Sequence, residues 1–163
     1  MNPSSSPLPE LPDVGFLAEV PSDHRAFLTG FGRFLRFHKD DIVIAEGTPQ
    51  ESLSLVLAGT MHVISTADER PILLATLGEG DSIGEINLFD PATASATVIA
   101  RSECLTWSIT RSELDGLVDA DLTTGLSVMK GLLRQLSRRV RHMNEKLATS
   151  EKWINDYWKT STP

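Results

Sequence analysis

Short apolar segments alternate with turn residues from about residue 33 to residue 109. Between residues 52 and 57 three leucines alternate with other residues, which is the period-two pattern of a strand with one buried face. No helix-length segment separates the strands, so an antiparallel sandwich or barrel is favoured over a parallel α/β sheet. The expected strands are residues 34–37, 42–45, 52–57, 61–64, 72–77, 94–100 and 104–109.

The N-terminal part predicts less regular structure. Residues 1–12 have the composition of a flexible leader, and residues 13–120 are expected to form the barrel domain. Within it, residues 14–19 and 22–28 each predict a short helix, and Ser22 is expected to act as the N-cap of the second one.

After Ile109 the pattern becomes helical. Thr110 or Ser112 is expected to cap a short helix, and Asp121 a long one over residues 121–160, followed by a tail at 161–163. About 38 helical residues would span about 57 Å. Apolar residues recur there at spacings of four and three, the heptad repeat of a left-handed coiled coil. The positions are Leu122, Leu126, Met129, Leu133, Leu136, Val140, Met143, Leu147, Ser150, Ile154 and Tyr157.

A single small barrel cannot bury this whole stripe. Val128 and Leu132 are expected to pack inward, whereas the stripe itself predicts a parallel homodimer. The fold class is therefore mainly β with helices (α+β): an antiparallel barrel or jelly roll with short N-terminal helices and a long C-terminal dimerisation helix. The predicted dimer interface is Leu126, Met129, Leu133, Leu136, Val140, Met143, Leu147, Ile154 and Tyr157.

Three aromatic residues near the end of this helix allow two interpretations. Tyr157 would extend the seam while Trp153 and Trp158 pack on the neighbouring subunit or the barrel. Alternatively, the three residues would form a docking patch for another protein or a lid over a pocket.

Composition and charge narrow the function. The chain has 163 residues, of which 40% are hydrophobic, and this suits one compact domain. It has one cysteine, and no secretory signal or membrane-length apolar run is evident, so a cytoplasmic location is expected. The net charge of −7 argues against a nucleic-acid binder, although residues 122–163 carry +5 and the remainder −12. The basic helix is expected to be a solvated face, with polyanion binding as the alternative.

The candidate chemistry lies in the stretch from Leu77 to Val98. A Gly84-Glu85 step is expected to open one helical turn, whose unpaired backbone N–H groups favour an anion. Gly84 would let a ligand approach the backbone, and the Glu85 carboxylate could accept hydrogen bonds from a hydroxyl pair such as that of a ribose.

Residues 83–88 and 95–98 resemble the phosphate-binding cassette of the cyclic-nucleotide-binding domains of the catabolite-activator family. The resemblance extends over roughly residues 14 to 150, through Leu57-Ala58-Gly59 upstream and Leu136-Ser137-Arg138-Arg139 downstream. It implies a barrel that binds cyclic AMP, cyclic GMP or a related phosphorylated ligand. The ligand-binding residues that it implies are Ile83, Gly84, Glu85, Ile86, Asn87, Ala94, Ser95 and Ala96.

The sequence departs from the family at two positions. Ala94 stands where the family has a phosphate-clamping arginine, and its loss is expected to cost about 1.5–3 kcal/mol of binding free energy. Met143 stands at the position of an adenine-contacting threonine. An arginine of the long helix, among 134, 138, 139 and 141, could supply the missing charge. The expected helix contacts to the ligand are Arg138, Arg139, Met143 and Asn144.

Together these features predict a dimeric regulatory module that senses a ligand, with no catalytic residues, cofactor or metal. The family's transcription factors continue into a winged helix-turn-helix, for which this sequence leaves no room, so output through a partner protein is expected, without DNA or membrane binding. A degenerate pocket used as a constitutive scaffold is the main alternative. A cupin-like metalloenzyme is disfavoured because His24, His38, His62 and His142 are scattered.

Overall fold

The computed structural model describes residues 10–66 and 70–160, with side chains as far as residue 149. A 3₁₀ turn, η1, and a helix, α1, precede a strand-rich region interrupted by the short helix α2, and α3 and α4 follow. The elements are η1 (Gly15–Leu17), α1 (Ser22–Leu28), β1 (Arg33–Phe37), β2 (Ile42–Ile44), β3 (Pro49–Gln50), β4 (Ser52–Ala58), β5 (Met61–Ser65), β6 (Ile72–Leu77), β7 (Ser82–Ile83), α2 (Glu85–Phe89), β8 (Ala92–Thr93), β9 (Thr97–Ala100), β10 (Cys104–Thr110), α3 (Arg111–Ala120) and α4 (Leu122–Thr160).

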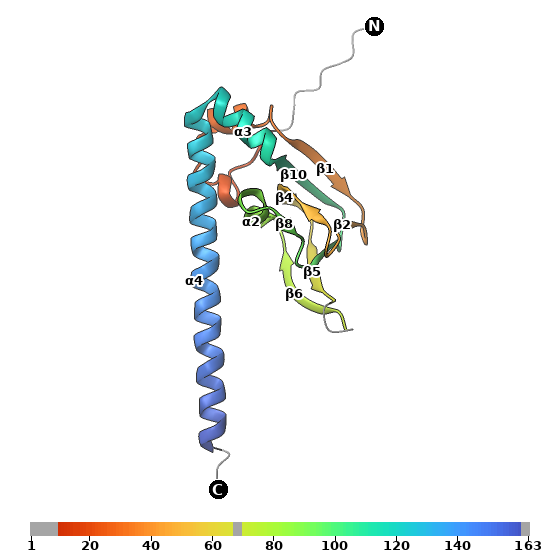
Figure 1. Cartoon of the computed structure of the whole chain (residues 1–163), viewed down its shortest axis with the longest axis vertical. Coiled ribbons are helices and arrows are strands. Elements are labelled where there is room, and N and C mark those ends of the chain that lie inside the picture. The colour runs from red at the N-terminus through yellow and green to blue at the C-terminus, as the bar shows by residue number, and fades with distance from the viewer. Residues whose placement is uncertain (1–9, 67–69, 161–163) are drawn as a thin grey trace.

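The described strands form two four-stranded sheets, ordered β1-β10-β4-β7 and β2-β9-β5-β6, and a two-stranded sheet of β3 and β8. Every described pairing is antiparallel, and the long helix lies along one side of the sheets (Figure 1). The predicted antiparallel barrel with a long C-terminal helix is confirmed.

Strand β4 separates two hydrophobic clusters. Leu53 and Leu55 pack in one cluster with residues of η1, α1, α3 and α4, whereas Val56 packs in the other, inside the barrel. The prediction of one buried face for residues 52–57 is therefore wrong: the helical layer covers the leucine face, and the barrel interior covers the face that the sequence pattern assigned to solvent.

The first helical element of the N-terminal segment is shorter and more tightly wound than predicted. A single 3₁₀ turn, Gly15–Leu17, replaces the helix expected over residues 14–19. Pro21 holds the N-cap position of α1, and its carbonyl oxygen accepts from the Arg25 N–H at 2.9 Å. Ser22 is already helical, so the prediction that its side chain caps this helix is wrong.

The caps predicted for the last two helices are present. The Thr110 hydroxyl accepts from the Glu113 N–H, and the Glu113 carboxylate accepts from the Thr110 N–H, which completes a capping box for α3. Before α4, Asp121 Oδ1 accepts from the Thr123 N–H at 2.9 Å. These caps fix the corner at which the chain turns from the barrel into α4.

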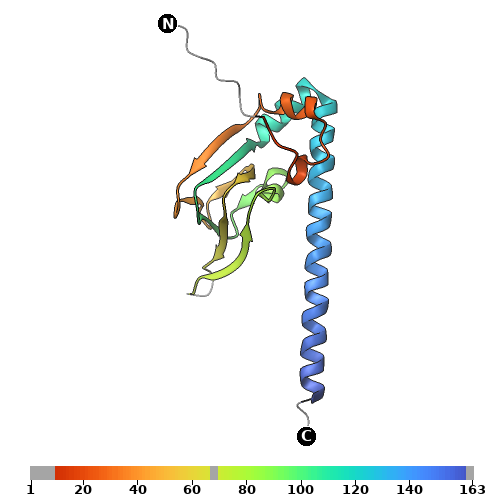
Figure 2. The ribbon, with the colours of Figure 1, turned by 180° about the vertical axis from the view of Figure 1, so that it is seen from behind.

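The first half of α4 packs on the domain, and the second half extends past it (Figures 1 and 2). Val128 and Leu132 are each 1% exposed, which confirms their predicted inward packing. Gly131 lies directly against η1, where a Cβ atom would overlap the carbonyl oxygen of Phe16. Only glycine at this position allows α4 to approach the N-terminal segment so closely.

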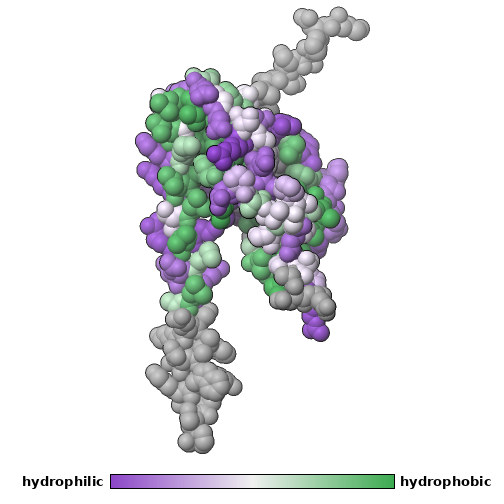
Figure 3. Space-filling model, in the orientation of Figure 1, coloured by the Kyte–Doolittle hydropathy of each residue, from purple (hydrophilic) through white to green (hydrophobic). Residues whose placement is uncertain are grey.

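The heptad stripe of α4 is largely uncovered in this single chain. Met129 and Leu136 are half-buried, while the apolar side chains further along form a column on the helix surface in Figure 3. Ile154, Tyr157 and the two tryptophans lie outside the residues whose side chains are described. The exposed stripe residues are Leu122, Leu126, Leu133, Val140, Met143 and Leu147.

Candidate functional site

The predicted helical turn after Gly84 is present as α2. Gly84 occupies the N-cap position with φ +83°, and a Cβ atom there would overlap the carbonyl oxygen of Ser52. A side chain would therefore be excluded both by backbone conformation and by space. The glycine turns the chain from strand β7 directly into the helix that begins with Glu85.

Glu85 is buried, with 4% of the residue exposed, and it is held by an arginine of α4. Its Oε1 atom forms an ion pair with Arg139 Nη1, while Arg139 Nη2 donates to the Ser82 carbonyl oxygen at 3.2 Å. A buried carboxylate without a partner would be costly, and this charge-assisted contact offsets that cost. The same arginine joins the first half of the cassette to α4.

A second polar contact lies one helical turn earlier. Gln135 Nε2 donates to the Gly80 carbonyl oxygen at 3.3 Å, so α4 holds the backbone at two points on either side of Asp81. At this junction Ser82 Oγ and Gln135 Oε1 are buried and have no hydrogen-bond partner among the described residues. Such atoms normally find a partner in ordered water or a ligand, so the junction retains hydrogen-bonding capacity.

The second half of the cassette is fixed mainly by backbone pairing. The Ala94 N–H donates to the Thr48 carbonyl oxygen, and the Ala94 carbonyl oxygen accepts from the Gly47 N–H, both at 2.8 Å. Ser95 is exposed, and Ala96 is 7% exposed. The strand predicted from residue 94 begins only at Thr97, because Ala92 and Thr93 form the separate strand β8 with β3 and residues 94–96 connect the two strands.

Asn87 connects the two halves of the cassette. Its Nδ2 atom donates to the Ala92 carbonyl oxygen at 2.9 Å, so an α2 side chain holds the loop that leads to Ala94. Ile86, in contrast, is 65% exposed on α2, and Ile83 is half-buried beside the second core cluster. The structure thus brings together Ile83 to Asn87 and residues 94–96 in one continuous turn-helix-loop segment.

The arginines of α4 divide into two groups. Arg134 and Arg138 both pair with Glu19, just after η1, the Arg138 Nη2 to Glu19 Oε1 distance being 3.3 Å. Of the arginines predicted to reach the cassette, Arg139 does so, but it binds the Glu85 carboxylate. The sequence did not indicate the role of Glu19, since no local pattern relates it to α4.

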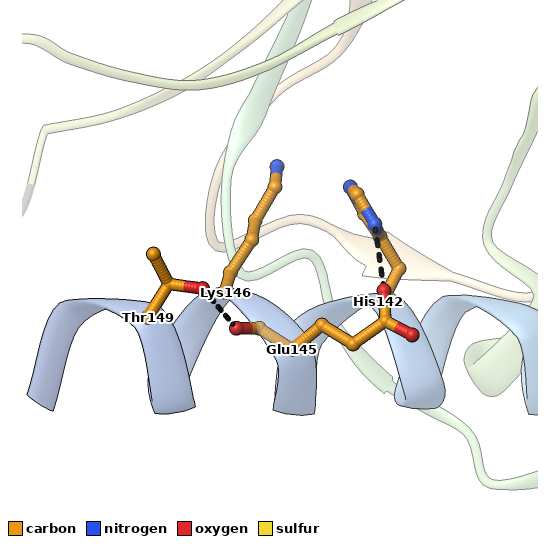
Figure 4. Close-up of a pocket in the computed structure, with 4 residues that line it drawn as sticks. All are labelled: His142, Glu145, Lys146 and Thr149. Carbon is orange, nitrogen blue, oxygen red and sulfur yellow. Dashed lines mark hydrogen bonds and ion pairs between the residues drawn. The ribbon is translucent and has the colours of Figure 1, made fainter. Parts of the chain in front are cut away.

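Further along α4, Met143 and Asn144 are exposed, and neighbouring side chains line an open depression. Figure 4 shows His142, Glu145, Lys146 and Thr149 on one side of the helix; His142 Nδ1 lies 3.9 Å from Glu145 Oε2. These residues continue the barrel-facing side that carries Leu132, Gln135 and Arg139. The residues on this barrel-facing side recur at alternating spacings of three and four, and this spacing is the sequence signal that could have identified the side.

The histidines lie in separate surroundings. His24 Nδ1 is 3.1 Å from Ser127 Oγ, and His38 is an exposed residue whose hydrogen bond to Glu103 raises its pKa. Cys104 is buried in β10. Within the described residues, no cluster of three or more histidine, cysteine, aspartate or glutamate side chains is placed to bind a metal ion.

Within the described residues no helix combines the length and the apolar character that crossing a bilayer requires.

Residues 34–121 match the cyclic nucleotide-binding domain family. The chain is 36% identical over 115 residues to a CRP-like cAMP-activated global transcriptional regulator of Mycobacterium tuberculosis; the match covers 69% of this chain and 49% of that protein. The chain thus spans about half the length of the curated relatives that it matches.

Solved structures show the same fold. The N-terminal domain of a transcriptional regulator from Streptomyces coelicolor A3(2) has 27% identity and a TM-score of 0.67, over 80% of this chain and 91% of that one. A cyclic nucleotide-binding domain from Methylobacillus flagellatus has 24% identity and a TM-score of 0.74, over 80% of this chain and 74% of that one. The chain belongs to the cyclic nucleotide-binding domain family and is related to the Crp-like regulators.

Proposed function

We propose that the chain is a homodimeric sensory module that binds a cyclic nucleotide, cyclic AMP or cyclic GMP, or a related phosphorylated ligand at the cassette of residues 83–96. The observation that carries this proposal is the ion pair between the buried Glu85 carboxylate and Arg139. A carboxylate placed after a left-handed glycine and joined to the long helix connects the ligand site to the element that would respond.

The mechanism follows from these contacts. Hydroxyl groups of a ribose would donate to Glu85, and Ser82 Oγ and Gln135 Oε1 would satisfy further polar groups or waters. If a ligand changes the hydrogen bonds at Glu85, the contacts of Arg139 with Glu85 and with the Ser82 carbonyl oxygen change as well. A ligand shifts α4 only as far as its affinity differs between two helix arrangements.

The exposed heptad stripe supports a parallel dimer. In the heptad register, Arg139 and Lys146 occupy positions beside the seam, facing their own domain. Asn144 of a second copy would then lie across the seam from Arg139. A partner protein reached through α4 remains our proposal for the output of the module, and we propose no enzymatic activity, cofactor or resident metal for it.

A specific observation favours a second function. Ala94 stands where the family has its phosphate-clamping arginine, and the arginine that does reach the cassette, Arg139, pairs with Glu85 and not with residues 94–96, so a phosphate there would lack that counter-charge. The alternative is therefore a domain that binds no nucleotide and serves as a constitutive scaffold.

Calorimetric titration with cyclic AMP and cyclic GMP tests the two functions. We expect weak binding by the wild-type chain and its loss in Glu85→Gln. Ala94→Arg should strengthen binding about 10- to 150-fold, since it restores a charge-assisted contact worth about 1.5–3 kcal/mol. No heat at millimolar ligand with either the wild type or Ala94→Arg would rule out the sensor and favour the scaffold.

A further inference from the structure

A small apolar groove lies where α2 meets α4. Its volume is about 150 Å³, and its lining combines the last residue of α2 with residues from two turns of α4. All of the lining residues are apolar: Phe89, Met129, Leu132, Leu133 and Leu136. Because α2 begins with Glu85, the groove lies at the opposite end of the helix that carries the candidate ligand-binding carboxylate.

Both walls of this groove are exposed. Phe89 is 45% exposed and Leu133 is 64% exposed, while Ile86 on α2 is 65% exposed. Large apolar side chains gathered in this way are characteristic of a surface that another molecule covers. The floor of the groove is formed by Leu132, which is 1% exposed and belongs to the domain core.

The α4 helix of a second copy fits this groove. Met129, Leu133 and Leu136 belong to the groove and also to the heptad stripe, so the two surfaces are continuous. Leu132 occupies the position beside the seam on the side of α2, and a helix packed along the seam therefore passes Phe89. A second copy is the occupant that this continuity favours, because each copy brings an identical apolar stripe to a two-fold seam.

We propose that the α4 helix of a second copy packs on Phe89 as well as on the heptad stripe, so that the dimer interface includes α2. This inference rests on the proposed dimer and extends it to a residue outside α4. Since Phe89 and Glu85 share one short helix, dimer formation and ligand binding act on the same element. Ligand binding and dimerisation should then be thermodynamically linked, each changing the other by the same factor.

Analytical ultracentrifugation of the full chain and of Phe89→Ala tests the contact. We expect a dimer dissociation constant about 10 to 100 times larger in the variant, because the two-fold axis removes the side chain twice from the interface. Ile42→Ala serves as the matched control, since Ile42 is 63% exposed on β2, away from α4. Equal dissociation constants for Phe89→Ala and wild type would overturn the inference and leave the proposed dimer intact.

A second measurement does not depend on the stability of the variant. Benzoylphenylalanine at position 89, activated by light, should link two copies of the chain through α4, whereas the same probe at position 42 should not. Links within one chain, or to a different protein, would contradict the proposed occupant. A wild-type chain that stays monomeric at every concentration would overturn both this inference and the proposed dimer.

Discussion

The two halves of α4 have similar apolar patterns but very different surroundings. Between residues 124 and 139 the helix has a buried face that packs on η1 and α3, and its arginines pair with Glu19 and Glu85. Every described residue from Val140 to Thr149 is exposed. An apolar stripe therefore predicts a helix that packs against another surface, but it does not say which surface. The rest of the chain determines which half of the helix is covered within the monomer.

Truncation of a side chain in the packed half should have the largest effect on folding. Leu132→Ala removes a fully buried side chain and leaves a cavity, which should lower the free energy of unfolding by about 2–5 kcal/mol. The matched change in the exposed half is Leu147→Ala. Chemical denaturation at several protein concentrations separates the two: the first variant should be destabilised at every concentration, the second only where the dimer forms.

A charge on the exposed stripe should break the dimer without unfolding the domain. Val140→Asp places two carboxylates in the seam of a parallel pair, and we expect the dissociation constant to rise about 100-fold or more. Arg141→Asp introduces the same carboxylate one position away, outside the seam. Sedimentation equilibrium measures both, and a Val140→Asp dimer as tight as that of the control would remove α4 from the interface.

The two groups of arginine contacts should differ in strength. Arg139→Met leaves Glu85 buried without its ionic partner, and we expect a loss of about 1–3 kcal/mol in the free energy of unfolding, since part of the arginine is solvated. Arg138→Met removes an exposed ion pair with Glu19, for which about 0–1 kcal/mol is typical. Thermal or urea unfolding of both variants tests the contrast, and equal effects would mean that Glu85 is solvated.

The capping box that precedes the packed half should give a small pH dependence. The hydrogen bond from the Thr110 backbone lowers the pKa of Glu113 below its usual value of 4.5. A lowered carboxyl pKa means that its stabilising contribution is present above the unfolded-state value and is lost as the pH falls through the folded-state value. Glu113→Gln should therefore flatten the loss of stability on acidification below about pH 4.5, by roughly 0.3–1.5 kcal/mol. Unfolding curves of both proteins at a series of acidic pH values measure it.

The strands longer than two residues were largely predictable, because alternation and turn residues mark them along the chain. The two-residue strands β3, β7 and β8 were not predicted, since pairs of residues carry no period. These short strands position the cassette: β8 pairs with β3 beside Ala94, and β7 carries Ser82 next to Arg139. The segment around Gly84 was identified by its resemblance to a family, and its helical turn is confirmed.

The local elements of this protein follow from residues close together along the chain: the capped corner at Thr110 and Asp121, the long helix with its heptad repeat, and the Gly84-Glu85 step that opens one helical turn. Long-range packing, in contrast, brings Arg139 to Glu85 and Arg134 and Arg138 to Glu19, and it covers β4 on both faces. The two kinds of interaction differ in their range along the chain. Caps and periodicity act between residues a few positions apart, whereas an ion pair between residues 85 and 139 depends on how closely α4 packs against η1 at Gly131.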